Sequence, residues 1–156
     1  MNTYNIDIIS FKEAINEILN TNKFEYLQSC LETEGEIEYD NNKWVISYKN
    51  GKNLNNNLYT NYNSKKYKWI SVKDNLGNII ALQFIYIDND YIELINVNKV
   101  DGYKDIFENI VNFISNTYNK DIITFPLNNK LTSYYKKFGF MEYKNDYLKY
   151  IIKQIH

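Results

Sequence analysis

Hydrophobic and polar residues alternate over residues 4–9 before the segment becomes apolar, and this pattern predicts a short first strand. Ser10 and Glu13 follow with the spacing of a capping box, in which each side chain accepts a hydrogen bond from the other residue's backbone N–H. The helix predicted to begin there has apolar residues at the spacing of one buried face, namely Phe11, Ala14, Ile15, Ile18 and Leu19. The same spacing predicts a second, shorter helix with the apolar residues Phe24, Leu27 and Leu31.

The pattern weakens between residues 35 and 63. Two short runs, 36–39 and 44–48, are able to pair as a hairpin, whereas 50–63 is polar and rich in turn-forming residues. Such a long loop can be a flap that contacts substrate or a solvated connection, and we favour the solvated connection. Nothing in this variable region marks a domain boundary, so we interpret residues 1–156 as a single domain.

The pattern becomes firm again at residue 68. It predicts strands over 68–72, 79–87 and 91–97, separated by turn-forming residues at 74–78 and 88–90. Because short turns join neighbouring antiparallel strands, the three segments predict an antiparallel meander.

A helical pattern follows the meander, with Ile106, Ile110, Phe113, Ile114 and Thr117 on one face. Residues 122–125 then predict a short apolar strand that ends at Pro126. The last helix is predicted by Leu131, Tyr134, Tyr135 and Phe138, with Gly139 as its C-terminal cap. Residues 140–143 and 147–152 predict a terminal hairpin, so the element order is β-α-α-(β-β)-β-β-β-α-β-α-β-β.

Composition narrows the classes of function. The 156 residues are 44% hydrophobic, which is enough for one domain with its own core. The net charge of -1 gives no overall field that would attract nucleic acid or an anionic membrane. All 18 basic residues are Lys, so a bound anion has to be held by lysine or by backbone N–H groups rather than by a planar guanidinium.

Several chemistries lack their residues. Cys30 is the single cysteine and His156, the single histidine, is the last residue, which argues against an internal disulfide and against histidine-based nucleophilic catalysis. The acidic residues Asp88, Asp90 and Glu93 lack the ligand number and the glycine of a calcium loop, so we expect no metal. The absence of a leader pattern and of an apolar run of about 20 residues predicts a cytoplasmic protein that does not contact a membrane.

The segment 128–140, with the sequence NNKLTSYYKKFGF, resembles the C-terminal signature of the GNAT acyltransferase superfamily, roughly N-x-x-A-x-x-[aromatic or aliphatic]-Y-x-x-x-G-F. Asn128, Tyr135, Gly139 and Phe140 are in register with it, and Leu131 stands where the family has a small residue. The element order agrees with the family most clearly over 66–153. The resemblance implies an α+β fold with a central mixed, mostly antiparallel sheet flanked by helices, and acetyl-CoA as acyl donor.

The resemblance also implies roles for individual residues. In the family, the strand that matches 91–97 separates from its neighbour, so that backbone groups at Ile95 and Val97 would bind the pantetheine arm and the thioester oxygen. Tyr135 would protonate the departing thiolate, a step that suits a phenol; the alternative is an aromatic residue on a buried helix face. Glu93 would be the base, directly or through water, or else an ordinary solvated glutamate. Asn128 would bind the cofactor arm, cap the helix, or do both.

The loop that should hold the cofactor's pyrophosphate departs from the family, whose pattern there is [Q/R]-x-x-G-x-[G/A]. If the helix stripe is kept in register, the two glycine positions fall on Asp105 and Phe107, which bring negative charge and bulk. A shifted alignment over 99–104 keeps a basic residue and Gly102, and makes Gly102, Tyr103 and Lys104 the candidate cofactor-binding residues. Both alignments indicate a degenerate pyrophosphate-binding loop.

Two functions remain open on the sequence. The first is an N-acetyltransferase that acts on a primary amine of a small molecule or protein, as a monomer or homodimer, with no nucleic acid or metal involved. The second is a catalytically degenerate protein of the same fold that binds or inhibits a protein partner. The C-terminal signature favours the first, and Asp105 and Phe107 favour the second.

Overall fold

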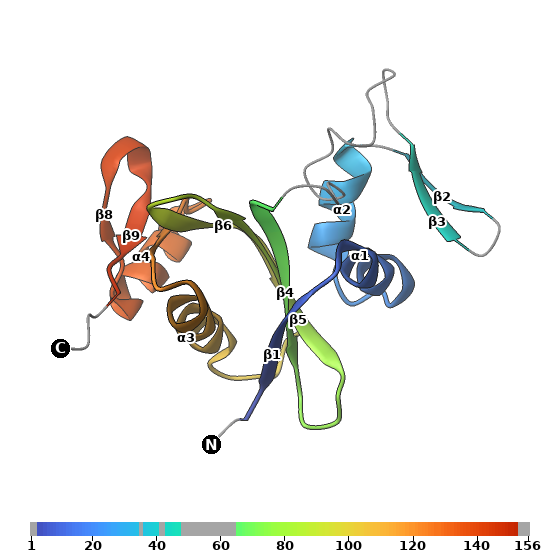
Figure 1. Cartoon of the computed structure of the whole chain (residues 1–156), viewed down its shortest axis with the longest axis horizontal. Helices are drawn as coiled ribbons and strands as arrows, with labels where there is room; N and C mark the ends of the chain where they lie inside the picture. The colour runs from blue at the N-terminus through green and yellow to red at the C-terminus, as the bar shows by residue number, and fades with distance from the viewer. Residues whose placement is uncertain (1–2, 35, 41–42, 48–64, 153–156) are drawn as a thin grey trace.

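The computed structural model describes residues 3–34, 36–40, 43–47 and 65–152, with side chains at 3–31 and 65–152 (Figure 1). The N-terminal elements are β1 (Asn5–Ile9), α1 (Phe11–Asn20), α2 (Glu25–Glu34), β2 (Glu36–Asp40) and β3 (Lys43–Ser47). Helix α1 begins as its sequence predicts, because Ser10 Oγ accepts a hydrogen bond from the Glu13 N–H at 3.1 Å. The interpretation of 50–63 lies outside the described residues.

The remaining elements are β4 (Tyr67–Lys73), β5 (Ile79–Ile87), β6 (Tyr91–Lys99), α3 (Ile106–Tyr118), β7 (Asp121–Thr124), α4 (Asn129–Phe138), β8 (Met141–Glu142), the 3₁₀ helix η4 (Lys144–Asp146) and β9 (Leu148–Tyr150). The strands among them form with β1 a seven-stranded sheet in the order β1-β4-β5-β6-β7-β9-β8, and β2 and β3 pair separately. All the pairs in this sheet are antiparallel except β6 and β7, which are parallel. The predicted element order and the mixed, mostly antiparallel sheet are confirmed.

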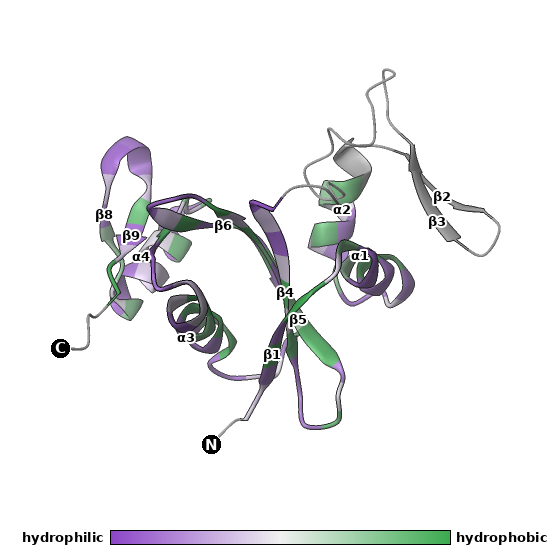
Figure 2. Ribbon diagram, in the orientation of Figure 1, coloured by the Kyte–Doolittle hydropathy of each residue, from purple (hydrophilic) through white to green (hydrophobic). Residues whose placement is uncertain are grey.

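Helices cover both faces of the sheet (Figure 1). One buried cluster joins α1 and α2 to the sheet through residues such as Ile18, Leu27 and Phe84. The other joins α3 and α4 to the opposite face through residues such as Ile110 and Tyr135. Figure 2 shows hydrophobic positions on the sides of the helices that face the sheet, as expected for two cores separated by one sheet.

Strand β6 is irregular at its centre. Phe84 lies opposite Asn96 while its neighbour Ile85 lies opposite Leu94, so Ile95 is an extra residue in β6, a β-bulge. The parallel pairing with β7 covers only Tyr91–Leu94, and β7 ends at Thr124. Beyond Leu94, no described strand pairs with β6 on the β7 side.

Local sequence explains why the chain leaves β7 there. Pro126 has no N–H to continue the ladder. Asn128 then caps α4, with its Oδ1 accepting a hydrogen bond from the Leu131 N–H at 2.8 Å. At the other end of α4, Gly139 has a φ of +120° and closes the helix as predicted.

Candidate active site

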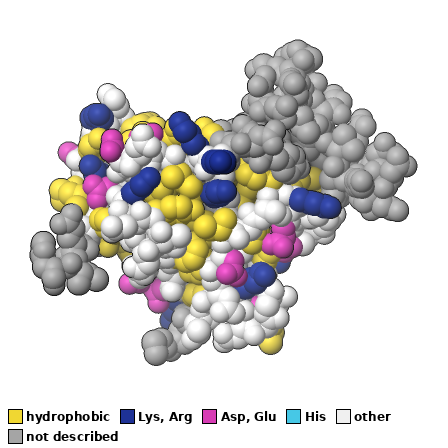
Figure 3. Space-filling model, viewed as in Figure 1, with side chains coloured by type: hydrophobic (Ala, Val, Ile, Leu, Met, Phe, Trp, Pro, Cys, Tyr) yellow, Lys and Arg dark blue, Asp and Glu magenta, His cyan; other side chains and the backbone are white. Residues whose placement is uncertain are grey.

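A cavity of about 490 Å³ lies where β6 loses its pairing with β7. Its walls come from α2, β5, β6, α3, the end of β7 and α4. The lining residues on the strands and at the end of β7 are Gln83, Leu94, Ile95, Asn96, Val97, Lys99, Thr124 and Phe125. Those from the helices and the loop before α4 are Tyr26, Phe107, Leu127, Asn128, Lys130, Leu131, Tyr134 and Tyr135. Figure 3 shows, on the face in view, hydrophobic side chains with lysine side chains at their border.

Tyr135 is both a core residue and a wall of this cavity. It is 8% exposed, and its ring lies 5.1 Å from that of Phe107 and 5.5 Å from that of Phe140, measured between centroids. Burial raises the pKa of its phenol, and a hydrogen bond with the Thr124 side chain opposes the rise. The hydroxyl is therefore protonated at neutral pH and can donate a proton inside the cavity.

Three of the other predicted residues lie in the same cavity. Ile95 is the bulged residue of β6, and Val97 follows it on the stretch that has no described partner strand toward β7. Asn128 lines the cavity while capping α4, so the two interpretations of this residue are compatible. The structure thus brings Tyr135, Ile95, Val97 and Asn128 together.

Glu93 lies apart from them. It is not among the residues that line the cavity, and it points to the face of the sheet opposite Leu94, which packs with α3. Burial raises the pKa of its carboxyl, and a hydrogen bond with the Tyr147 hydroxyl opposes the rise. The Glu93 side chain therefore lies on the face of β6 that α1 and α2 cover.

A second cavity, of about 290 Å³, adjoins the N-terminus of α3 and is lined by the loop that connects β6 to this helix. Gly102 has a φ of +97° there, with open space at the position of a Cβ. Asp105 precedes α3 with a φ of +62° and makes no side-chain capping hydrogen bond, so its side chain satisfies none of the N–H groups of the first turn. Asp101 and Asp105 both line this cavity.

The other predicted residues of this loop are placed differently. Tyr103 lines the second cavity, but its hydroxyl donates to Asp74 Oδ2 at 3.1 Å. Lys104 lines neither cavity, and its backbone carbonyl accepts a hydrogen bond from the Tyr4 hydroxyl at 2.6 Å. Phe107 lines the second cavity and the first, and its ring is 2% exposed and packs between α3 and α4, so the bulk expected of it at this loop stays a prediction.

Solved structures with the same architecture match the chain over nearly its whole length. An acetyltransferase of the GNAT family from Staphylococcus aureus Mu50 has a TM-score of 0.58 and 17% identity, covering 94% of this chain and 98% of its own. The chain has the GNAT fold. PaiA N-acetyltransferase from Thermoplasma acidophilum, solved with coenzyme A, has a TM-score of 0.54 and 14% identity, over 94% and 96% of the two chains. The KacTA–DNA complex contains a chain with a TM-score of 0.56 and 11% identity, over 95% and 92%. No family model and no curated protein matches the sequence.

Within this GNAT fold, sequence reasoning missed Gln83. It is 1% exposed and lines the large cavity from β5. Its Nε2 donates to the carbonyl oxygens of Phe84 at 2.9 Å and Asn96 at 3.0 Å, which joins β5 to β6 at the bulge. The amide orientation follows because both partners are acceptors, and Oε1 has no partner among the described residues. The available signal was a lone glutamine in the otherwise apolar 79–87 strand.

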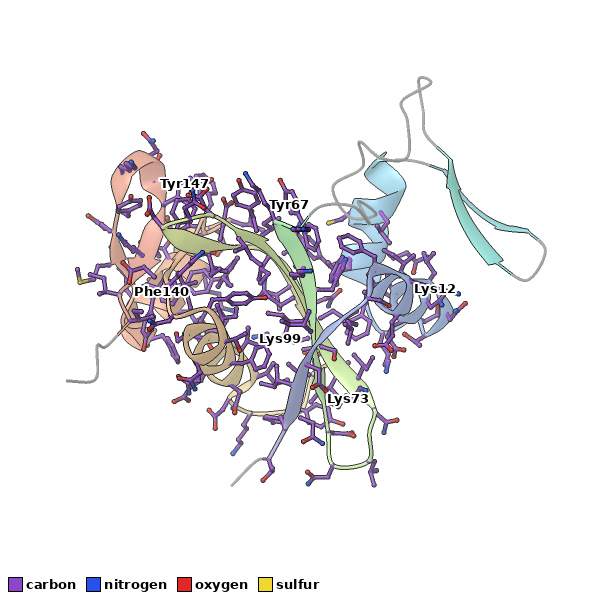
Figure 4. The ribbon with its side chains drawn as sticks, in the orientation of Figure 1. Lys12, Tyr67, Lys73, Lys99, Phe140 and Tyr147 are labelled. Atoms are coloured by element: carbon purple, nitrogen blue, oxygen red, sulfur yellow. The ribbon has the colours of Figure 1, made fainter. Side chains whose placement is uncertain are left out.

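Lys99 was noted only as the basic residue of the shifted loop alignment. It lines the two cavities described above (Figure 4). Its Nζ lies 5.8 Å from the centroid of the Tyr134 ring. Desolvation lowers the pKa of its ammonium. It is the lysine best placed to attract an anion between the two cavities.

Two kinds of feature are absent from the described part of the chain. No cluster of three or more histidine, cysteine or acidic side chains is placed to hold a metal ion among the residues that the structure describes. Over the same residues, no helix is both long enough and apolar enough to cross a membrane.

Proposed function

We propose that the protein is an N-acyltransferase that moves an acetyl group from acetyl-CoA to a primary amine of a small molecule or protein. The observation that carries the proposal is a strand, β6, that bulges at Ile95 and loses its β7 partner beside the buried hydroxyl of Tyr135. Unpaired backbone groups and a buried proton donor are what thioester aminolysis requires from a protein.

The proton donor and the proton acceptor of the proposed reaction lie on opposite faces of the sheet, with Tyr135 on the α3/α4 face and Glu93 on the α1/α2 face. When bound, acetyl-CoA supplies the thioester carbonyl carbon and the thiolate leaving group. Backbone groups at Ile95 and Val97 orient the thioester and polarise its oxygen. The amine loses a proton to Glu93 or to a water that Glu93 holds, its nitrogen bonds to the carbonyl carbon, and the carbon–sulfur bond breaks. Tyr135 donates its proton to the departing sulfur.

The cavity fits the cofactor's pantetheine arm better than its pyrophosphate. The large cavity offers an apolar wall and the Asn128 side chain to the arm. At the second cavity, Gly102 and the first-turn N–H groups of α3 favour an anion, while the carboxylates of Asp101 and Asp105 oppose one. We therefore expect coenzyme A to bind with an affinity that depends on Lys99.

These two aspartates also support the second candidate function. A GNAT-fold protein that no longer holds the cofactor would bind or inhibit a protein partner through its tyrosine-rich surface. In either case we propose a cytoplasmic, single-domain monomer or homodimer. The KacTA structure is a complex with DNA, but the net charge of -1 of this chain gives no field for nucleic acid.

The first experiment is a calorimetric titration with acetyl-CoA and with coenzyme A at low salt, which preserves lysine–phosphate attraction. We expect a dissociation constant on the order of micromolar, followed by turnover in a screen of amines. Asp105→Asn is the matched variant: it keeps a residue that tolerates the left-handed conformation but removes the charge, so it should tighten binding. No binding of either ligand at millimolar concentration would favour the second function.

A further inference from the structure

A row of side chains crosses the α1/α2 face of the sheet at the end where β4 begins. Tyr67 lies opposite Tyr86, and Tyr86 lies opposite Glu93, so the three share one face. The ring centroids of Tyr67 and Tyr86 are 5.0 Å apart. All three residues are partly exposed, unlike the core residues on the other face of the same strands.

Two more tyrosines complete this group. Tyr91 lies two residues before Glu93 and therefore on the same face of β6, and the Tyr147 hydroxyl hydrogen-bonds the Glu93 carboxylate. Figure 4 shows Tyr67 and Tyr147 at the same end of the sheet. We call Tyr67, Tyr86, Tyr91, Glu93 and Tyr147 the tyrosine site.

The tyrosine site has an unbalanced charge. Of the ion pairs formed by residues 3–31 and 65–152, none includes Glu93. The nearby ammonium of Lys149 is engaged elsewhere, since it lies 3.4 Å from Asp121 Oδ2 and 4.8 Å from the Tyr143 ring centroid. A half-buried carboxylate among aromatic rings attracts a cation from outside, through charge and through the ring faces together.

The tyrosine site also adjoins the proposed reaction centre. Glu93 and Ile95 are two residues apart on β6, and Ile95 packs against the buried cluster of the α1/α2 face, the face on which Glu93 lies. Tyr147 packs against Phe125 with ring centroids 5.3 Å apart, and Phe125 lines the large cavity. Tyr135 approaches the cavity from α4, on the opposite face.

From this arrangement we infer that the acceptor of the proposed acyl transfer is a primary alkylammonium compound, held by its charge at Glu93 and by its methylene groups against the rings of Tyr67, Tyr86 and Tyr147. The inference rests on the proposed function and assigns its substrate class. An α-amino acid is a poor acceptor, because its carboxylate would meet Glu93. An aromatic amine is also poor, because it carries no charge at neutral pH.

The test uses n-butylammonium as the probe, with n-butanol as the uncharged match and norvaline as the carboxylated match. Binding is followed without any cofactor, by NMR of the protein with carbon-13-labelled tyrosine. We expect butylammonium to shift the signals of the tyrosine site at concentrations where butanol and norvaline do not. Glu93→Gln should weaken binding about tenfold or more, and Tyr86→Leu about fivefold.

Two further variants separate recognition from folding. Tyr86→Phe keeps the ring and should retain most of the affinity, whereas Tyr4→Leu removes a ring beside the opposite end of β4, where Asn5 pairs with Lys73, and should leave butylammonium binding unchanged. Equal binding of butylammonium and butanol, or unchanged affinity in Glu93→Gln, overturns the inference even if acetyl-CoA binds. Butylammonium binding by a protein that fails to bind acetyl-CoA supports the site and overturns acyl transfer instead.

Discussion

Replacing Tyr135 with phenylalanine separates the two roles that the structure gives this residue. The substitution removes one hydroxyl and keeps the ring that packs on Phe107 and Phe140. The folded state loses one hydrogen bond, to Thr124, with a net value of about 1 kcal/mol. For a chain of this length, that corresponds to a decrease in melting temperature of about 3 °C.

The expected loss in catalysis is larger. Removing a general acid costs roughly 10²- to 10⁴-fold in rate, which is about 3–5 kcal/mol in the activation free energy. Coenzyme A affinity should stay nearly unchanged, because the hydroxyl acts on the sulfur only as it leaves. Turnover, the cofactor dissociation constant and thermal unfolding of the same preparation give all three quantities.

Tyr134→Phe is the matched control. Tyr134 is the adjacent residue, also lines the cavity, and is 44% exposed. The variant therefore lacks a hydroxyl of an exposed tyrosine, whereas Tyr135→Phe lacks a hydroxyl of a buried one. We expect it to retain most of the activity. If Tyr135→Phe turns over at the wild-type rate, the acid assignment is wrong. If it loses about 3 kcal/mol or more of stability, the hydroxyl belongs to the core, and a rate loss of similar size carries no information about catalysis.

The remaining predictions concern the loop before α3 and the tyrosine site. Gly102→Val puts a β-branched residue at a φ of +97° and should cost about 1–3 kcal/mol of stability while abolishing coenzyme A binding; unaltered affinity in a calorimetric titration would remove this turn from the site. The free energy of unfolding of Glu93→Gln, measured relative to that of the wild type, should be higher at pH 7 than at pH 4. Burial raises the pKa of Glu93 in the folded state, so the wild type loses stability as pH rises from the unfolded pKa through the folded one, and the variant does not. Thermal unfolding of both proteins across this range measures the difference, and parallel curves would contradict the stated burial.

Elements whose signals lie within a few residues were predictable. Ser10, Asn128 and Gly139 were assigned as caps from sequence, and the structure shows the corresponding hydrogen bonds or backbone conformation. The three strands of the meander were also found, because apolar runs bounded by turn-forming residues can be recognised without knowledge of the partner strand. Such interactions join residues that are close in the chain, so the sequence is enough to predict them.

The chemistry at β6 required the partner strands. The sequence placed Ile95 and Val97 on a strand. The bulge at Ile95 becomes apparent only from the pairing of β5 with β6, in which Phe84 lies opposite Asn96 and Ile85 opposite Leu94. Gln83 looked like an isolated polar residue until its amide was found between two strands. Register is a property of two segments together, and neither segment contains it alone.

The loop before α3 shows the same division between local and tertiary information. Sequence alone allowed two alignments, one of which puts Asp105 and Phe107 at the two glycine positions of the family pattern. In the structure α3 begins at Ile106, and the Phe107 ring packs in the core against Tyr134 and Tyr135.

By itself, the sequence determined the order of the elements, the helix caps and the presence of Tyr135 in a GNAT-like signature. The packing of α3 and α4 against the sheet decided which side chains face the cavity, because burial depends on contacts between segments far apart in the chain.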